Sequence, residues 1–111
     1  MTPKNFVDGL HTTIVEENSN AYWDLFTNTA IEDSSDPYWK QALTFFSELS
    51  EGQRKIFFSV IRQVTVDTTS NVLGVIDGVN IIPGNYHEFK LSCDGDDLSG
   101  DLQSLFLVKE E

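Results

Sequence analysis

Four aspartates near the C-terminal end form the densest group of side chains that could bind a ligand. They lie among two glycines, in the order Asp94, Gly95, Asp96, Asp97, Gly100 and Asp101. Close carboxylates are typical of calcium loops, but the EF-hand pattern fails because Leu98 and Leu105 occupy its fifth and twelfth positions. A solvated turn with a helix cap, or an acidic patch facing a basic partner, also explains the aspartates. We therefore assign no metal to this group.

A second acidic group lies beside aromatic residues. Its carboxylates are Glu32, Asp33 and Asp36, and Tyr38 and Trp39 follow directly. Exposed carboxylates next to an aromatic side chain suit a protein interface, where the ring supplies binding energy and the rim charges steer the partner. Asp36 and Trp39 are better explained as a helix cap and a core residue. Tyr38 is the better interface candidate, because it lies off the apolar side of its helix.

The residues that most often carry catalysis are few and scattered. The histidines are His11 and His87, the single thiol is Cys93, and Asp67 lies in the middle of a long helical pattern. A Cys–His pair needs a third group to orient it, and a metal site needs further ligands. Phosphate-binding loops, nucleophile elbows and dinucleotide fingerprints do not occur in the sequence. We therefore expect a chain that is not an enzyme and binds no cofactor.

The overall charge favours a basic protein partner. Eighteen acidic and seven basic side chains give a net charge of -11 in 111 residues, of which 40% are hydrophobic. This excess costs folding energy through self-repulsion and exceeds the charge of about 2–8 that keeps a small domain soluble. Anionic lipids and nucleic-acid backbones would be repelled, so we expect no direct contact with a membrane or with nucleic acid.

Length and targeting signals predict a single cytoplasmic domain. A chain of 111 residues suits one compact domain over residues 1–111. No apolar run is long enough to cross a membrane, and the first residues lack the basic-then-apolar order of a signal peptide. The lone cysteine excludes an internal disulfide and fits a reducing compartment.

Two helical stretches are predicted before residue 50. The first begins at Thr2-Pro3, where a hydroxyl cap precedes a proline. Residues 18–20 either interrupt this pattern or only bend it, so that residues 3–28 form one helix or two. The second stretch begins with the same signal at Asp36-Pro37 and runs to Leu49. Its expected core residues are Trp39, Ala42, Leu43, Phe46 and Leu49.

One long central helix is predicted after residue 50. Ser50 and Gln53 match the capping box that starts a helix, and Gly78 is suited to its C-terminal end. Between them, apolar and β-branched residues recur at helical spacing: Phe57, Val60, Ile61, Val64, Thr68, Val72, Val75 and Ile76. Asp67 would be either exposed or satisfied by Arg62 or nearby threonine hydroxyls.

The last part of the chain predicts a small hairpin and a closing helix. Residues 87–93 alternate between apolar and polar, as in a half-buried strand, and Asp94-Gly95 is a turn signal. Residues 96–99 make a poor return strand, and Leu102, Leu105 and Phe106 are spaced for a short helix. The predicted fold is α+β and mostly α, a helical bundle around a long central helix with a small antiparallel β-hairpin near the C-terminus.

Several segments together resemble a family of small acidic bacterial proteins. They are FFSELSEGQR at 45–54, VDTT at 66–69, LGVIDG at 73–78 and GDLQSLFL at 100–107. They are similar to immunity proteins of contact-dependent growth inhibition and other polymorphic toxin systems. The resemblance covers roughly residues 37–107. It carries over no catalytic residue, because such proteins act by occluding their toxin.

The resemblance implies a cytoplasmic protein that neutralises a basic toxin, such as a nuclease, by blocking its cleft. The contact would use one of two acidic groups: Glu32, Asp33 and Asp36 with Tyr38, or Asp94, Asp96, Asp97 and Asp101. Two alternatives stay open. A DNA-mimic inhibitor would present carboxylates over an extended face, and a small enzyme would bring Asp67, His87 and Cys93 into one cleft.

Overall fold

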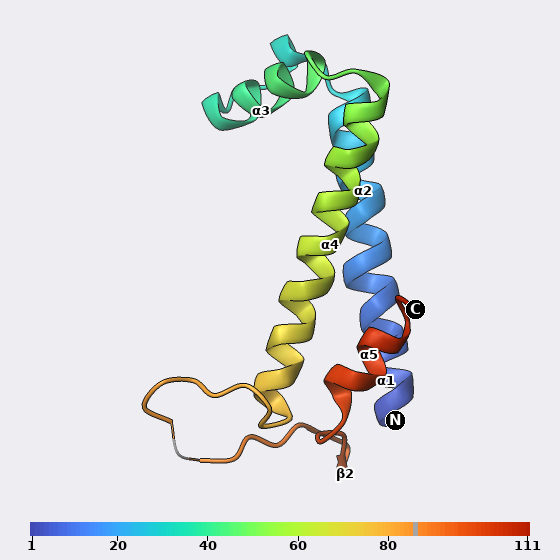
Figure 1. Cartoon of the computed structure of the whole chain (residues 1–111), viewed down its shortest axis with the longest axis vertical. Helices are drawn as coiled ribbons and strands as arrows, with labels where there is room; N and C mark the ends of the chain where they lie inside the picture. The colour runs from blue at the N-terminus through green and yellow to red at the C-terminus, as the bar shows by residue number, and fades with distance from the viewer. Residues whose placement is uncertain (86) are drawn as a thin grey trace.

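The computed structural model describes residues 1–85 and 87–111. Two long helical segments run antiparallel along the molecule, and a shorter helix crosses one end (Figure 1). In chain order the elements are α1 (Pro3–Leu10), the π-helix η1 (His11–Glu16), α2 (Glu17–Asn28), the 3-10 helix η2 (Ile31–Asp33), α3 (Pro37–Ser47), α4 (Glu51–Ile76), β1 (Ser92–Cys93), β2 (Asp96–Asp97) and α5 (Leu102–Val108). The predicted mostly helical α+β fold with a C-terminal hairpin is confirmed.

α1, η1 and α2 form one continuous helical segment, so residues 3–28 are one helix and not two. The Thr2 side chain caps its start by accepting a backbone N–H of the first turn at 3.1 Å. The irregular part is η1, which precedes the polar residues 18–20. There the N–H of Glu17 reaches back five residues to the carbonyl of Thr12. The wider π turn re-aims side chains, and the buried residues of α1 and η1 are Val7, His11 and Val15.

α3 begins at the predicted cap, because the Asp36 carboxylate accepts the Tyr38 N–H at 2.8 Å. Leu43 and Phe46 of α3 are buried, as expected, together with Phe26 of α2. The other predicted core residues, Trp39, Ala42 and Leu49, are only partly buried at the edge of the same cluster. α3 ends at Ser47, so Leu49 follows the helix and is not its last residue as predicted.

α4 begins and ends where the sequence predicts, after Ser50 and before Gly78. The Ser50 hydroxyl accepts the Gln53 N–H, and the Gln53 side chain accepts the Ser50 N–H. At the other end Gly78 has a φ of +80°, a conformation that a side chain would strain. The N–H groups of Gly78 and Val79 bond to the carbonyls of residues 75 and 74, which are the two hydrogen bonds of a Schellman motif.

The apolar spacing predicts α4 correctly but does not mark its buried side. The buried residues of α4 are Val66, Ser70, Leu73 and Gly74. Several residues of the predicted pattern are instead exposed, on a row with four-residue steps: Val60, Val64, Thr68 and Val72. The reason is tertiary, because the other helices pack against α4 from one side and leave this row uncovered.

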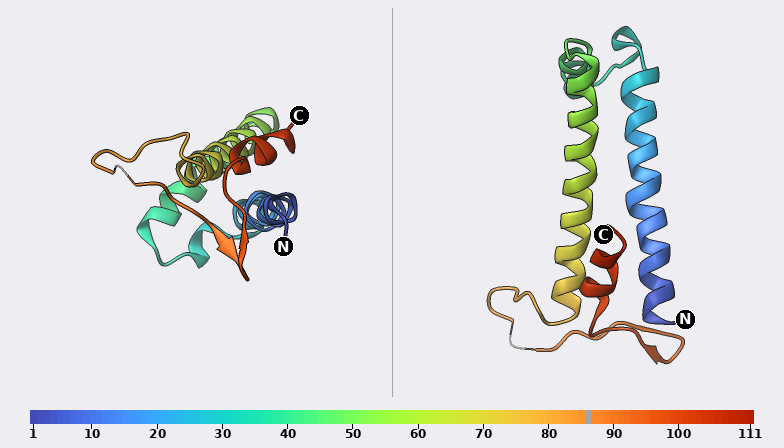
Figure 2. Two further views of the ribbon diagram at one scale, coloured as in Figure 1. Left: turned by 90° about the horizontal axis from the view of Figure 1, so that it is seen from below. Right: turned by 45° about the vertical axis from the view of Figure 1, so that its right-hand side comes forward.

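Two hydrophobic clusters lie toward opposite ends of α4. One joins it to α1, η1 and α5 through Val7, Val15, Val66, Leu73, Leu102 and Phe106. The other consists of the buried residues Phe26 of α2 and Leu43 and Phe46 of α3, against which α4 packs partly buried side chains: Phe57, Phe58 and Ile61. α5 covers only the end of the helix pair where the N-terminus lies, and α3 lies over the opposite end (Figure 2).

The molecule is elongated. Its extents are 49 × 30 × 25 Å and its radius of gyration is 17.7 Å, whereas a compact chain of this length has a radius of about 13 Å. No helix within residues 1–85 and 87–111 is long and apolar enough to cross a membrane.

The C-terminal hairpin is shorter than predicted. Its two-residue strands pair Ser92 with Asp97 and Cys93 with Asp96. Asp94 and Gly95 both have positive φ, 49° and 84°, as a type I′ turn requires. Residues 87–90 lie outside the strand, and Phe89 is 46% exposed, so their alternation does not reflect a buried face. Residues 96–99 were expected to make a poor return strand, but Asp96 and Asp97 do pair with β1. The predicted closing helix is present as α5.

Candidate protein-binding surface

The two acidic groups lie at opposite ends of the long axis. Glu32 and Asp33 belong to η2 and Asp36 caps α3, at the end of the molecule that α3 crosses (Figure 1). The other group lies at the opposite end and is called the hairpin aspartates below: Asp94, Asp96, Asp97 and Asp101. All the carboxylate residues of both groups are exposed: Glu32, Asp33, Asp36, Asp94, Asp96, Asp97 and Asp101. They therefore form two separate acidic surfaces and not a single site.

The surface at the α3 end combines carboxylates with an aromatic side chain. We call Glu32, Asp33, Asp36 and Tyr38 the Glu32–Tyr38 surface. Tyr38 is 65% exposed, and its ring meets the edge of the Trp39 ring with centroids 5.2 Å apart. None of the ion pairs formed by the described residues includes its three carboxylates. An exposed ring with carboxylates that form no ion pair a few residues away has the composition of an interface hot spot and its rim.

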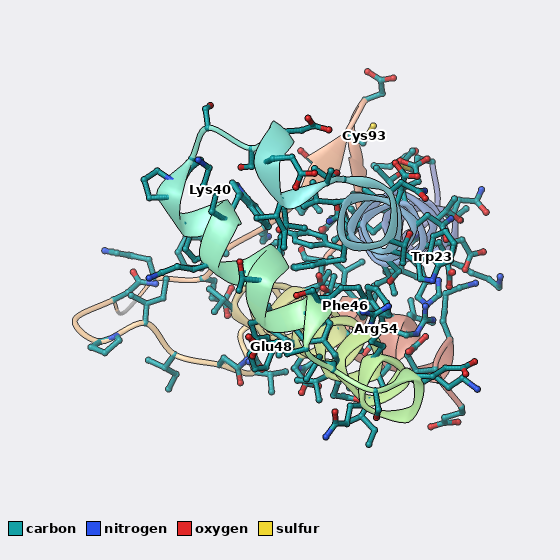
Figure 3. All side chains as sticks on the ribbon, turned by 90° about the horizontal axis from the view of Figure 1, so that it is seen from above. Trp23, Lys40, Phe46, Glu48, Arg54 and Cys93 are labelled. Carbon is teal, nitrogen blue, oxygen red and sulfur yellow. The ribbon has the colours of Figure 1, made fainter. Side chains whose placement is uncertain are left out.

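Packed aromatic rings support this surface from below. The Phe26 ring lies 5.2 Å from that of Phe46 and 5.0 Å from that of Phe57. Figure 3 looks onto this end and shows Lys40 on the outer part of α3 and Phe46 nearer the helix pair. The Arg54 guanidinium of α4 stacks over the Phe46 ring at 4.5 Å, which adds a cation–π contact between α3 and α4. These contacts hold α3 against α2 and α4.

The hairpin aspartates are partly used within the chain. Asp96 lies 3.4 Å from the N-terminal amino group. Asp97 accepts the Ser99 hydroxyl at 2.7 Å and the Ser99 N–H at 3.0 Å, and these hydrogen bonds lower its pKa. Asp101 stands at the start of α5 but makes no capping hydrogen bond. Among residues 1–85 and 87–111, no group of three or more His, Cys, Asp or Glu side chains is placed to hold a metal ion.

The cap of α5 comes instead from Asp77, at the end of α4. Its carboxylate accepts the Gly100 N–H at 2.9 Å and the Gln103 N–H at 2.8 Å. These bonds span 23 and 26 residues of sequence. No local pattern could have revealed them.

Sequence reasoning also missed a polar cluster that ties the C-terminus to the helix pair. His11 Nε2 lies 2.7 Å from Glu110 Oε2, and Arg62 donates to Glu110 at 2.9 and 3.2 Å and to Glu16 at 3.0 Å. His11 is only 7% exposed. The one signal in the sequence was the four-residue spacing of His11 from Val7, which places a titratable ring on the apolar side of the helix.

The charges in this cluster stabilise one another. Hydrogen bonding from Arg62 holds the pKa of Glu16 below its ordinary value of 4.5. Burial acts to raise the pKa of Glu110, but the hydrogen bonds from His11 and Arg62 outweigh it and the pKa is lowered. The same carboxylates raise the pKa of Arg62. The cluster therefore joins η1 and α4 to the residues that follow α5, through Arg62 and the carboxylates of Glu16 and Glu110.

The groups that an enzyme would need belong to different elements. Asp67 is exposed on α4 and accepts a hydrogen bond from the Gln63 side chain at 2.9 Å. Arg62, which the sequence suggested as its partner, binds Glu16 and Glu110 instead. His87 is exposed between α4 and β1, and Cys93 is a half-buried free thiol in β1. No hydrogen bond found among the described residues joins any two of Asp67, His87 and Cys93.

Comparisons with protein-family models, with curated proteins and with solved structures give no match. The assignment of a function therefore depends on the surfaces of this chain alone.

Proposed function

We propose that this chain is an acidic protein-binding module, and specifically an immunity protein that neutralises a basic toxin by covering its active-site cleft. The observation that carries the proposal is the Glu32–Tyr38 surface. It places an aromatic side chain that is 65% exposed beside three carboxylates that lack an ion-pair partner among the described residues. Aromatic anchors with a charged rim are what protein interfaces use.

The charge distribution supports a basic partner. A net charge of -11 would attract a basic cleft and raise the association rate above the ~10⁵–10⁶ M⁻¹s⁻¹ of an unsteered encounter. If the toxin is a nuclease, the carboxylates take the places of substrate phosphates. The Tyr38 ring then slows dissociation by burying apolar area. Occlusion of this kind requires no catalytic group on the inhibitor.

Two observations favour the α3 end over the alternatives. The hairpin aspartates Asp96 and Asp97 already have partners within the chain, whereas at the α3 end only Asp36 is engaged in this way, by the Tyr38 N–H. A DNA mimic would need carboxylates spread along an extended face, but on α4 the stretch from Ile56 to Val72 contains a single acid, Asp67. A local contact through the Glu32–Tyr38 surface therefore accounts best for the arrangement.

Two variants with equal charge change test the proposal. Glu32→Lys/Asp33→Lys and Asp96→Lys/Asp101→Lys each add four positive units, from -11 to -7, so both weaken long-range steering alike. Each chain is co-expressed with the product of the gene next to its own, and association rates with that product are measured by surface plasmon resonance. We expect the first variant to lose protection and at least tenfold in association rate, because it also places lysines against the basic cleft. The second should keep protection.

Tyr38→Ala should raise the dissociation rate tenfold or more and leave the association rate nearly unchanged. Absence of any complex with the neighbouring gene's product would sink the immunity role. Equal losses in the two charge variants would show that the Glu32–Tyr38 surface is not the contact.

A further inference from the structure

A hollow of about 380 Å³ lies between α2 and α4, beside the ion pair of Arg62 with Glu110. Trp23 of α2 and Phe58 and Ile61 of α4 supply its apolar walls. Trp23 is 54% exposed, and none of the ring contacts found among the described residues includes it. A space of this size between two helices, with aromatic walls, is typical of small-molecule sites.

The charge around this hollow is opposite to that of the whole molecule. Lys55 and Arg62 line it, and no acidic side chain of the described residues does, although the chain has eighteen acids and seven bases. Arg62 is already bound by Glu16 and Glu110. Lys55 is exposed and takes part in none of the ion pairs formed within residues 1–85 and 87–111. Its ammonium group is therefore available to an anion.

A buried hydroxyl group lies at the other end of the hollow. The Ser19 oxygen is shielded from solvent but has no hydrogen-bond partner in the described part of the chain. Such atoms are rare, because an unpaired buried polar group costs free energy. Ser19 follows Glu16, which binds Arg62, by three residues, so it lies near Arg62. Lys55 precedes Arg62 by seven residues, or about 10 Å of helix. Because α2 and α4 run antiparallel (Figure 1), Trp23 lies between Ser19 and Lys55.

We infer that the hollow binds a small aromatic carboxylate with a hydroxyl group at the far end of its ring system. The rings stack against Trp23 and Phe58, the carboxylate pairs with Lys55, and the hydroxyl group bonds to the Ser19 oxygen. A neutral ligand leaves Lys55 without a partner, and a cation is repelled by it. At physiological salt, charges further than about 8 Å away are largely screened, so the net charge of -11 does not exclude an anion.

NMR titration of the whole isotope-labelled chain with 6-hydroxy-2-naphthoate tests the inference. The indole N–H groups of Trp23 and Trp39 give separate cross-peaks, which Trp23→Phe assigns. The Trp23 cross-peak should shift to saturation with a dissociation constant below about 1 mM, and that of Trp39 should move much less. 2-Naphthoate lacks the hydroxyl group and 2-naphthol lacks the carboxylate, so each should bind at least about threefold more weakly.

Two lysine variants with equal charge change locate the carboxylate. Lys55→Gln should weaken the binding of both naphthoates at least about threefold and leave that of 2-naphthol unchanged. The matched control is Lys40→Gln on α3, away from Trp23 (Figure 3), which should bind like the wild type. Ser19→Ala should abolish the advantage of 6-hydroxy-2-naphthoate over 2-naphthoate, because it removes the partner of the ligand hydroxyl group. Circular dichroism checks that all variants remain helical.

Three results would overturn the inference. They are a Trp23 cross-peak that stays in place up to about 10 mM probe, equal shifts at Trp23 and Trp39, and equal binding by the Lys55 and Lys40 variants. None of them bears on toxin binding, because the Glu32–Tyr38 surface contains neither Trp23 nor Lys55. The two proposals therefore fail separately.

Discussion

Replacement of Gly74 by alanine should destabilise this protein, although the same change in the middle of a helix normally stabilises it. Alanine is favoured over glycine in a helix by about 0.8–1.0 kcal/mol. At Gly74, however, an added Cβ would lie 2.5 Å from Asn80 Nδ2 and 2.9 Å from Gln103 Nε2. Both side chains would have to move away.

The cost follows from the hydrogen bonds that these two side chains make. Gln103 Nε2 donates to the Ser70 carbonyl at 3.1 Å and to the Ser70 hydroxyl at 3.2 Å, and Asn80 donates to the Asn71 carbonyl at 3.1 Å. Ser70 is only 4% exposed, so water does not readily replace its partner. Loss of these bonds costs about 2–3 kcal/mol. After the helix-propensity gain of about 1 kcal/mol, the net loss is about 1–2 kcal/mol.

The assay is thermal unfolding followed by circular dichroism at 222 nm. We expect Gly74→Ala to lower Tm by about 4–8 °C in a domain of this size. The matched controls are Gly9→Ala and Gly52→Ala, at helical glycines where an added Cβ meets nothing within 4 Å. These variants should keep the wild-type Tm or raise it, because alanine in place of glycine adds up to about 1 kcal/mol to the free energy of unfolding. A Gly74→Ala variant at least as stable as the wild type would refute the reasoning.

Two further predictions concern the joints between α4, α5 and the first helix. Asp77→Ala should lower the free energy of unfolding by about 1–2 kcal/mol in urea titrations, because it removes the cap of α5; Asp101→Ala, at a carboxylate that makes no cap bond, should change it by less than about 0.5 kcal/mol. Acid should also destabilise the fold. Glu16 and Glu110 have pKa values below their ordinary 4.5, so their contribution is complete above about pH 4.5 and is lost as the pH falls through the lower folded values. The Tm of the wild type, measured between about pH 7 and pH 3, should therefore fall at the acid end. The Tm of Arg62→Met should fall less steeply over the same range. An acid dependence identical in both chains would contradict the assigned role of Arg62.

Elements whose signals are local could be predicted from the sequence alone. The cap-then-proline pairs at residues 2–3 and 36–37, the capping box of Ser50 and Gln53, and Gly78 all act within one helical turn. Asp94-Gly95 likewise needs only its own backbone to make a tight turn. Because each signal depends on hydrogen bonds between residues a few positions apart, it can be read without knowing the rest of the fold.

The residues of the two candidate surfaces could be predicted from the sequence, but their positions in the fold could not. That Tyr38 is exposed follows from its position on the helix, and the carboxylates around it are evident in the sequence. Their separation from the hairpin aspartates by the length of the molecule is visible only in the fold (Figure 1). The same limit applies to η1, whose wider turn changes which residues of the first helix face inward.

The buried side of α4 and the roles of the distant polar groups depend on how the helices pack, so they could not be predicted. The valine spacing predicts a helix but is the same for a buried and an exposed row, and the outcome depends on where α1, α2 and α5 pack. Asp77 caps a helix 26 residues further on, and His11 binds Glu110 across 99 residues. Such contacts exist because packing brings remote segments together. Local periodicity carries no information about that packing.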